Sequence, residues 1–186
     1  IGGSFIGCEV AASLTALGKH CTIVMLEEFT LENVFGREMG RFFHESLTRK
    51  GVTIHGGDTL ERFEGDGSVS RVLTKLGVTL DADLVVVGVG VTPETQLAAK
   101  AGLEIGERGG VRCTSRLETS APGIYAAGDM CEYESLLHDG APVRVEHWDV
   151  AFNQGKTVAL NMLGADIPHE TVPYFYSVLA GIGELE

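Results

Sequence analysis

Basic residues are scarce in this 186-residue sequence: 14 Lys and Arg stand against 26 Asp and Glu, and the formal net charge is -12. Nucleic-acid binding relies on clustered Lys and Arg, so we expect no nucleic-acid partner, while a basic partner protein stays open. Apolar runs such as residues 84–89 are far too short to cross a bilayer, and no basic segment followed by an apolar stretch marks a signal peptide. We therefore expect no membrane partner and a cytoplasmic location.

Closely spaced cysteines are also absent. The four cysteines, Cys8, Cys21, Cys113 and Cys131, lie far apart, with no CxxC or CxxxxC spacing. Such spacings are typical of zinc sites and of local redox disulfides. We therefore expect no metal site, and we interpret the cysteines as buried free thiols.

The sequence opens on a glycine-rich loop that leads into an amphipathic run, which predicts a helix over residues 6–17. Glycines at such a turn let the backbone approach phosphate groups closely, while the helix N-terminus supplies amides and a partial positive charge. Gly2 and Gly7 hold the first and last places of a GxGxxG pattern, with Ser4 in the middle place. The loop therefore predicts a dinucleotide site, and an ordinary glycine-rich turn is the alternative.

The following segments alternate between strand and helix patterns. We expect buried strands at residues 21–26, 52–55 and 84–89, and a helix whose face carries Met39, Phe42, Phe43 and Leu47 and which ends near Gly51. Short alternating segments over residues 60–80 predict an antiparallel meander. The fold class is therefore α/β, a Rossmann-like parallel sheet with an antiparallel meander.

The second half has a simpler pattern. We expect a short helix within residues 94–110, a strand at residues 124–127, a loop over residues 131–143 and a helix over residues 150–163. Gly128 and Asp129 follow the strand, where a glycine lets a ligand reach the backbone and a carboxylate accepts hydrogen bonds from sugar-like hydroxyls. An ordinary turn is again the alternative.

The stretch TSAPGIYAAGD at residues 119–129 resembles the second flavin-binding motif of the pyridine-nucleotide-dependent flavoprotein reductases. Together with GGSFIGCEVAASL, VVVGVGVTP and VEHWDVAFNQGKTVALNML, it is similar to the branch of ferredoxin reductases and apoptosis-inducing-factor-like proteins, including those with a Rieske domain. The resemblance implies an NAD-binding Rossmann-like domain at residues 1–92 and the second part of an FAD-binding domain at residues 93–165. It also implies the start of a truncated C-terminal interface domain at residues 166–186, so the chain is expected to be an internal fragment.

The resemblance also implies the cofactor contacts. The residues expected to wrap the NAD pyrophosphate are Gly2, Gly3, Ser4, Phe5, Ile6 and Gly7. The residues expected near the nicotinamide are Glu9, Gly88 and Gly90. The flavin would be held along its ribityl chain and at its pyrimidine end by Gly128, Asp129, Glu146, His147 and Trp148. Each group has a plainer alternative: Glu9 complementing the helix dipole, Gly88 and Gly90 as a tight strand exit, and His147 with Trp148 as a packed core pair.

The choice between NAD and NADP depends on an acid about 20 residues beyond the glycines, which binds the adenosine ribose. The position that matches the family holds Met25, with Glu27 and Glu28 slightly later. Glu27 is the expected ribose ligand, and no Arg or Lys is expected there to hold a 2'-phosphate. The sequence therefore favours NADH.

The implied activity is hydride transfer from NADH to FAD, followed by electron transfer to an iron-sulfur partner of the ferredoxin or Rieske type. No side chain is expected to act as a catalytic acid, base or nucleophile. Two alternatives remain, a disulfide or peroxide reductase on the same scaffold and a non-enzymatic redox sensor like apoptosis-inducing factor. The fragment alone is expected to be inactive and to hold FAD poorly, and the sequence gives no indication of oligomeric state.

Overall fold

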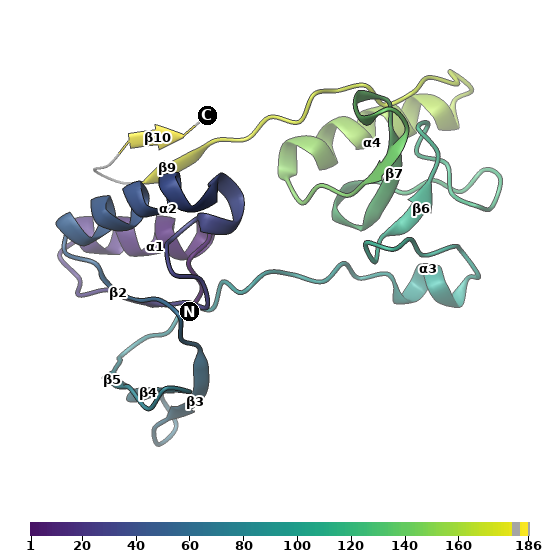
Figure 1. Ribbon diagram of the computed structural model, residues 1–186. Coiled ribbons are helices and arrows are strands. Elements are labelled where there is room, and N and C mark those ends of the chain that lie inside the picture. Colours follow the sequence, from purple (N-terminus) through teal and green to yellow (C-terminus); the bar gives the residue numbers. More distant parts are fainter. Residues whose placement is uncertain (180–182, 186) are drawn as a thin grey trace. The chain divides into compact units, whose positions relative to one another are not determined.

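The computed structural model describes residues 1–179 and 183–185. The chain forms two compact units, one of residues 1–90 with 176–186 and one of residues 91–175 (Figure 1). The assignment of residues 1–92, 93–165 and 166–186 to NAD, FAD and interface domains stays a prediction. Among the described helices, none combines the length and the apolar character that a membrane crossing needs.

The first unit begins with the α/β alternation expected from the sequence. Helix α1 (Phe5–Ala16) is followed by β1 (Thr22–Val24), α2 (Glu32–Arg49) and β2 (Thr53–His55), and β1 pairs with β2 in parallel. Both helices pack on this pair through a core of buried side chains: Cys8, Ala11, Ala12, Ile23, Met25, Leu31, Phe43, Leu47, Val52 and Leu179. The small side chains of α1 allow its backbone to approach the strands closely, which fixes the loop that precedes it.

Helix α2 differs from the expected regular helix. Leu31, just before it, has a left-handed backbone with φ 60°, and Gly36 interrupts it with φ 80° and ψ 170°. Phe43 is buried, but Met39 is 45% and Phe42 52% exposed, so the predicted apolar face is wrong for these two side chains. The interruption at Gly36 changes the direction of the chain and separates the first helical turn from the rest.

The predicted antiparallel meander is confirmed as a three-stranded sheet. It consists of β3 (Leu60–Glu64), β4 (Arg71–Thr74) and β5 (Thr79–Asp81) in the order β3-β4-β5. The buried Asp58 joins the start of β3 to the turn between β4 and β5, because its Oδ1 accepts hydrogen bonds from the amides of Thr59 (2.7 Å) and Leu76 (3.1 Å).

The strand predicted at residues 84–89 is wrong. This segment is extended, and two backbone hydrogen bonds join it to Ile1, from the Ile1 nitrogen to Val86 O (2.7 Å) and from Gly88 N–H to Ile1 O (2.8 Å). Pairing over one residue is too short for a strand, and Leu84 and Val89 remain more than two-thirds exposed. A cavity of about 610 Å³ lies beside Ile1, lined by α1, β1 and residues 80–86.

In the second unit, α3 (Gln96–Lys100) and β6 (Val111–Cys113) come before a short 3-10 turn, η1 (Gly128–Met130). They are followed by β7 (Cys131–Ser135), the turn η2 (Leu136–His138), β8 (Ala141–Val143) and α4 (Trp148–Met162). Strand β7 is central, parallel to β6 and antiparallel to β8. The core behind it comprises Ala98, Val111, Cys113, Leu117, Ala126, Cys131 and Tyr133.

Two sequence expectations for this unit are wrong. Residues 124–127 form no strand and make only the isolated bridge between Glu118 and Tyr125, whereas the predicted loop over residues 131–143 contains β7 and β8. The sequence did not predict β7 as a buried strand because it contains the charged residue Glu132, which is nevertheless only 2% exposed. Its Oε2 accepts hydrogen bonds from the amides of Arg108 (3.0 Å) and Gly110 (3.2 Å), which compensate for its burial.

The chain returns to the first unit through β9 (Ser177–Leu179), which is antiparallel to β10 (Gly183–Leu185). Strand β9 lies beside α1 (Figure 1), and Leu179 is buried in the core beneath this helix. The segment therefore contacts the helix that carries the glycine loop.

Candidate cofactor-binding site

The glycines at the start of α1 are required by contacts within the chain itself. Gly2 has φ 107°, and a Cβ placed on it would overlap the carbonyl oxygen of Gly88. A Cβ on Gly7 would likewise overlap the carbonyl oxygen of Gly2. Gly2, Gly7 and Gly88 are thus brought together into one tight loop, whereas Gly90 has φ 93° and open space around its Cα.

Gly3 connects this loop to the segment between β1 and α2. A Cβ on Gly3 would overlap the sulfur of Met25, and the amide of Leu31 donates a hydrogen bond to Gly3 O (2.8 Å). Residues 25–31 therefore lie against the glycine loop.

The first turn of α1 is open to a ligand. Ser4 stands at the N-cap position without a side-chain hydrogen bond to the helix, and the first turn carries no acidic residue. Helix geometry leaves the first amides without an intrahelical partner, which directs the N–H groups of Ile6 and Gly7 outward. Ile6 is 58% exposed. This is the environment that favours a bound anion.

Glu9 has a partner that the sequence did not indicate. Its Oε1 accepts hydrogen bonds from the hydroxyl of Ser177 (2.6 Å) and from the amide of Val178 (3.3 Å). Ser177 is 1% exposed and lies 168 residues further along the chain, so no local pattern could reveal the contact. In the described chain, Glu9 therefore anchors β9 to α1, and its approach to a nicotinamide stays a prediction.

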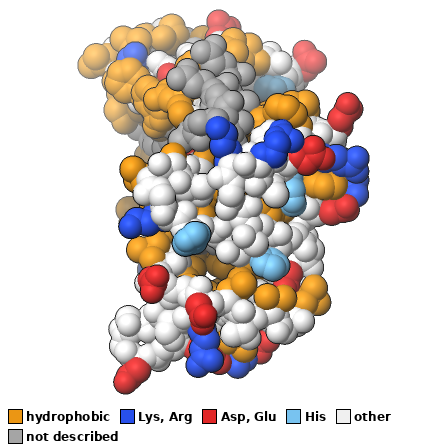
Figure 2. Space-filling model, turned by 90° about the vertical axis from the view of Figure 1, so that its left-hand side faces the viewer, with side chains coloured by type: hydrophobic (Ala, Val, Ile, Leu, Met, Phe, Trp, Pro, Cys, Tyr) orange, Lys and Arg blue, Asp and Glu red, His pale blue; other side chains and the backbone are white. Residues whose placement is uncertain are grey.

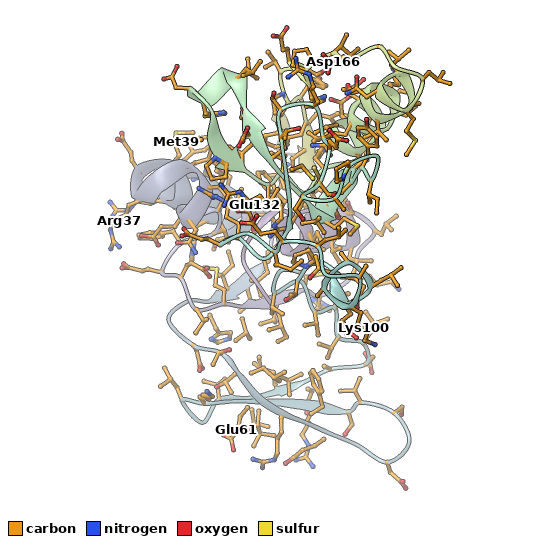
Figure 3. The ribbon with its side chains drawn as sticks, turned by 90° about the vertical axis from the view of Figure 1, so that its right-hand side faces the viewer. Arg37, Met39, Glu61, Lys100, Glu132 and Asp166 are labelled. Atoms are coloured by element: carbon orange, nitrogen blue, oxygen red, sulfur yellow. The ribbon has the colours of Figure 1, made fainter. Side chains whose placement is uncertain are left out.

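The corner expected to bind the adenosine ribose contains both acids and an arginine. Met25 is buried, and the Glu27 carboxylate accepts a hydrogen bond from Asn33 Nδ2 (2.6 Å). The expectation that no basic residue lies here is wrong, because Arg37 forms an ion pair with Glu28. Figure 3 shows Arg37 projecting outward from α2. The Glu28 carboxylate raises the pKa of the Arg37 guanidinium.

In the second unit, Gly128 lies at the start of η1 with φ 78°. Its amide donates to Gln154 Oε1 (2.7 Å) from α4. Gln154 is 1% exposed, and within the described residues its Nε2 has no hydrogen-bond partner. A buried donor without a partner is costly, and it suits a site where a bound group supplies the acceptor. Asp129 beside it is exposed.

Arg144 is a residue of this region that sequence reasoning missed. Its guanidinium donates to the carbonyl oxygens of Asp129 (3.0 Å) and Arg108 (3.1 Å) and pairs with Glu146 (2.6 Å). It thereby joins the loop of Asp129 to the segment that begins α4. The only available signal was that a basic residue in a strongly acidic chain stands two positions before Glu146.

Helix α4 begins with a side-chain cap. His147 Nδ1 accepts a hydrogen bond from the amide of Asp149 (3.2 Å), and the His147 ring lies 6.0 Å from that of Phe175. Trp148 is 64% exposed, which contradicts the alternative in which it forms a core pair with His147. This end of α4 presents aromatic side chains to its surroundings.

The thiols, the possible metal ligands and the surface charges bear on which kinds of site this chain can form. Burial raises the pKa of Cys8 to about 12, and the contact with Cys113 together with burial raises that of Cys131. Nowhere in the described part of the chain do three or more His, Cys, Asp or Glu gather in a way that could hold a metal ion. On the face drawn in Figure 2, acidic and basic side chains are interspersed rather than gathered by sign.

A family model described as pyridine nucleotide-disulphide oxidoreductase matches residues 1–155, and the chain belongs to this family. It is 34% identical over 181 residues to the ferredoxin–NAD(+) reductase subunit of the benzene 1,2-dioxygenase system of Pseudomonas putida, covering 97% of this chain and 43% of that protein. It is 30% identical over 182 residues to human apoptosis-inducing factor 3, covering 97% of this chain and 30% of that protein.

A solved structure, the covalent complex of putidaredoxin reductase with putidaredoxin, matches with a TM-score of 0.89 and 32% identity over 98% of this chain and 44% of that chain. The chain thus spans less than half of the length of these relatives. The α/β fold class and the resemblance to this branch of flavoprotein reductases are confirmed by these matches.

Proposed function

We propose that this chain supplies the NADH-binding surface and part of the FAD-binding surface of a flavoprotein oxidoreductase that passes electrons from NADH through FAD to an iron-sulfur partner. The observation that carries the proposal is the start of α1, an uncapped helix N-terminus without acidic residues, enclosed by glycines that tolerate no side chain. The similarity to a ferredoxin–NAD(+) reductase subunit supports a nicotinamide nucleotide and a ferredoxin as the two redox partners. A Rieske-type partner stays an alternative form of the same proposal.

At the nicotinamide nucleotide, the amides of Ile6 and Gly7 hold the pyrophosphate at the positive end of the α1 dipole. The backbone at Gly88, which packs against Gly2, and the open space at Gly90 let the nicotinamide end lie against the chain, and Glu27 accepts hydrogen bonds from the adenosine ribose. None of these groups exchanges a proton or an electron. Their contribution is to bind the nucleotide in one orientation.

At the flavin, Gly128 lets the ribityl chain approach the backbone, where the Asp129 carboxylate accepts its hydroxyl hydrogens and Gln154 Nε2 donates to it. His147, Trp148 and the first turn of α4 would hold the pyrimidine end, where the helix dipole, weakened by Asp149 in this turn, would favour negative charge. The flavin supplies the two-electron chemistry with the nicotinamide and the one-electron chemistry with the acceptor. The residues of this chain orient it and tune its surroundings.

The alternative of disulfide reduction finds no support in the described thiols. Cys8, Cys113 and Cys131 are buried, whereas thiol-disulfide exchange needs an accessible thiolate. The raised pKa of Cys8 and Cys131 keeps these two thiols protonated, and the contact with Cys131 lowers the pKa of the buried Cys113. Cys21 is partly exposed, so the expectation that all four thiols are buried is wrong for it.

Anaerobic stopped-flow reduction of the full-length protein tests the proposal. We expect NADH to bleach the flavin absorbance and the reduced protein then to pass electrons to a ferredoxin. Chemical reduction by dithionite serves as the control that the flavin is intact. A protein whose flavin is reduced by dithionite but by neither NADH nor NADPH would contradict the proposal.

A further inference from the structure

The segment between β1 and α2 lies where the adenosine end of a nucleotide would be bound. The hydrogen bond from Leu31 to Gly3 O joins this segment to the glycine loop. In a Rossmann-like fold, the pyrophosphate binds at the start of the first helix, and the adenosine ribose binds at the end of the strand that follows this helix. In this chain the helix is α1 and the strand is β1. Glu27 and Glu28 lie in the segment between β1 and α2, after Met25 and Leu26, so both carboxylates lie near this corner.

Arg37 reaches the same corner from α2. Its Nη2 pairs with Glu28 and its Nη1 with Glu32 (3.3 Å), and its Cζ lies 4.9 Å from the centroid of the Phe29 ring. The interruption of the helix at Gly36, immediately before Arg37, is where the chain departs from helical geometry. Three contacts therefore hold one guanidinium in place.

Glu32 itself is fixed, because its Oε2 accepts a hydrogen bond from the amide of Phe29 (3.0 Å) in the turn before α2. Within the described residues, the Glu28 carboxylate has no comparable backbone contact, and its side chain is 59% exposed. Glu28 is therefore the partner whose removal releases Arg37 with the least damage to the fold.

An arginine at this corner can bind the 2'-phosphate that distinguishes NADP from NAD. A guanidinium binds phosphate through paired hydrogen bonds, and Rossmann-like folds that accept NADP use a nearby arginine for the 2'-phosphate. In this chain, two carboxylates already occupy the guanidinium of Arg37, while Glu27 accepts a hydrogen bond from the uncharged Asn33. Arg41 lies on the same Phe29 ring, with its Cζ 5.1 Å from the ring centroid. A 2'-phosphate would meet repulsion from Glu27 and Glu28 while the guanidinium of Arg37 is engaged by its carboxylate partners.

We propose that Glu28 is a specificity residue that disfavours NADPH by occupying Arg37. The inference rests on the proposed function and explains the preference for NADH by an arginine that is present but engaged, rather than by an absent one. Both side chains of the pair are more than half exposed, so the effect is modest and weakened by salt.

Binding of NAD+ and NADP+ to the full-length protein, measured by titration calorimetry at low ionic strength, tests this inference. We expect Glu28→Gln to tighten NADP+ binding by about fivefold and to change NAD+ binding by less than about twofold. The double variant Glu28→Gln/Arg37→Gln should lose the gain for NADP+, because the released cation is then missing.

Glu61→Gln is the matched control. Glu61 pairs with Arg62 at 3.0 Å on the meander, its side chain is 49% exposed, and the substitution changes the net charge equally (Figure 3). The inference is overturned if Glu28→Gln affects NADP+ binding no more than Glu61→Gln, or if the double variant keeps the gain. A wild-type protein that binds neither nucleotide would instead overturn the proposed function, and this inference with it.

Discussion

Helices α1 and α4 both begin beside predicted cofactor contacts, but their first turns differ. Ser4 leaves the first turn of α1 without a side-chain cap and without an acid, whereas α4 has its cap from His147 and carries Asp149 in its first turn. A negative side chain and a cap both reduce the attraction of a helix N-terminus for an anion. The difference supports the proposal that the charged pyrophosphate binds at α1 and a weakly polar ring edge at α4.

The glycines of the two helices differ in the same way. Gly7 at the start of α1 leaves no space for a Cβ, while Gly155 within α4 has no atom of the chain within 4 Å of a built Cβ. Glycine is therefore indispensable to the fold in one helix and replaceable in the other.

The largest expected effect comes from exchanging these glycines for alanine. Gly7→Ala forces the loop apart and should lower the free energy of unfolding by about 2–4 kcal/mol. Gly155→Ala should raise it by about 0.5–1 kcal/mol, because alanine loses less backbone entropy in a helix. Urea denaturation of the full-length protein measures both free energies. Equal effects of the two substitutions would contradict the conclusion that glycine is required at position 7 and replaceable at position 155.

A smaller effect is expected from the caps. His147→Ala removes the acceptor for the Asp149 amide and should cost about 0.5–1 kcal/mol, whereas Ser4→Ala should change stability by less than about 0.3 kcal/mol. Urea denaturation of the full-length protein followed by circular dichroism measures both changes. A larger loss from Ser4→Ala than from His147→Ala would show that the assignment of caps is wrong.

The smallest effect concerns pH and the second unit. His169 is 3% exposed, its Nδ1 shares a hydrogen bond with Thr157 Oγ1 (3.2 Å), and burial lowers its pKa below the ordinary value of 6.5. The unfolded chain then binds a proton that the folded chain does not, so stability falls as the pH drops from 6.5 towards the lowered pKa. Above pH 6.5 His169 is mostly neutral in both the folded and the unfolded chain, so it adds no pH dependence to the free energy of unfolding.

Urea denaturation followed by Trp148 fluorescence at pH 7.5 and 5.5 measures this loss. His169→Gln keeps a polar side chain but cannot titrate, so its stability should change less between the two pH values than that of the wild type. Identical pH dependence in both proteins would rule out His169 as the cause.

The sequence predicted well those parts that depend on local periodicity. The alternation of α1, β1, α2 and β2 and the antiparallel meander follow from helical and strand spacing. The run at residues 84–89 was predicted to be a strand from its hydropathy, which does not report hydrogen-bond partners; the structure shows two backbone hydrogen bonds between this segment and Ile1. Strand β7 was missed because the buried Glu132 reads as a surface residue until its two amide partners are seen.

The candidate site was predictable in its glycines but not in its polar contacts. The spacing of Gly2 and Gly7 reflects a local turn, so sequence alone could predict it. The contact of Glu9 with Ser177 joins distant segments, and the approach of Arg37 to Glu28 depends on the interruption at Gly36. Such contacts are set by tertiary structure, which spacing does not encode.

Nuclear magnetic resonance of the isotope-labelled full-length protein during titration with NAD+ tests the central claim most directly. The account predicts that the amide signals of Ile6 and Gly7 shift strongly and with one binding constant, while those of the first turn of α4 shift little. Shifts confined to α4, or an unchanged signal from Ile6 and Gly7 at saturating nucleotide, would contradict it.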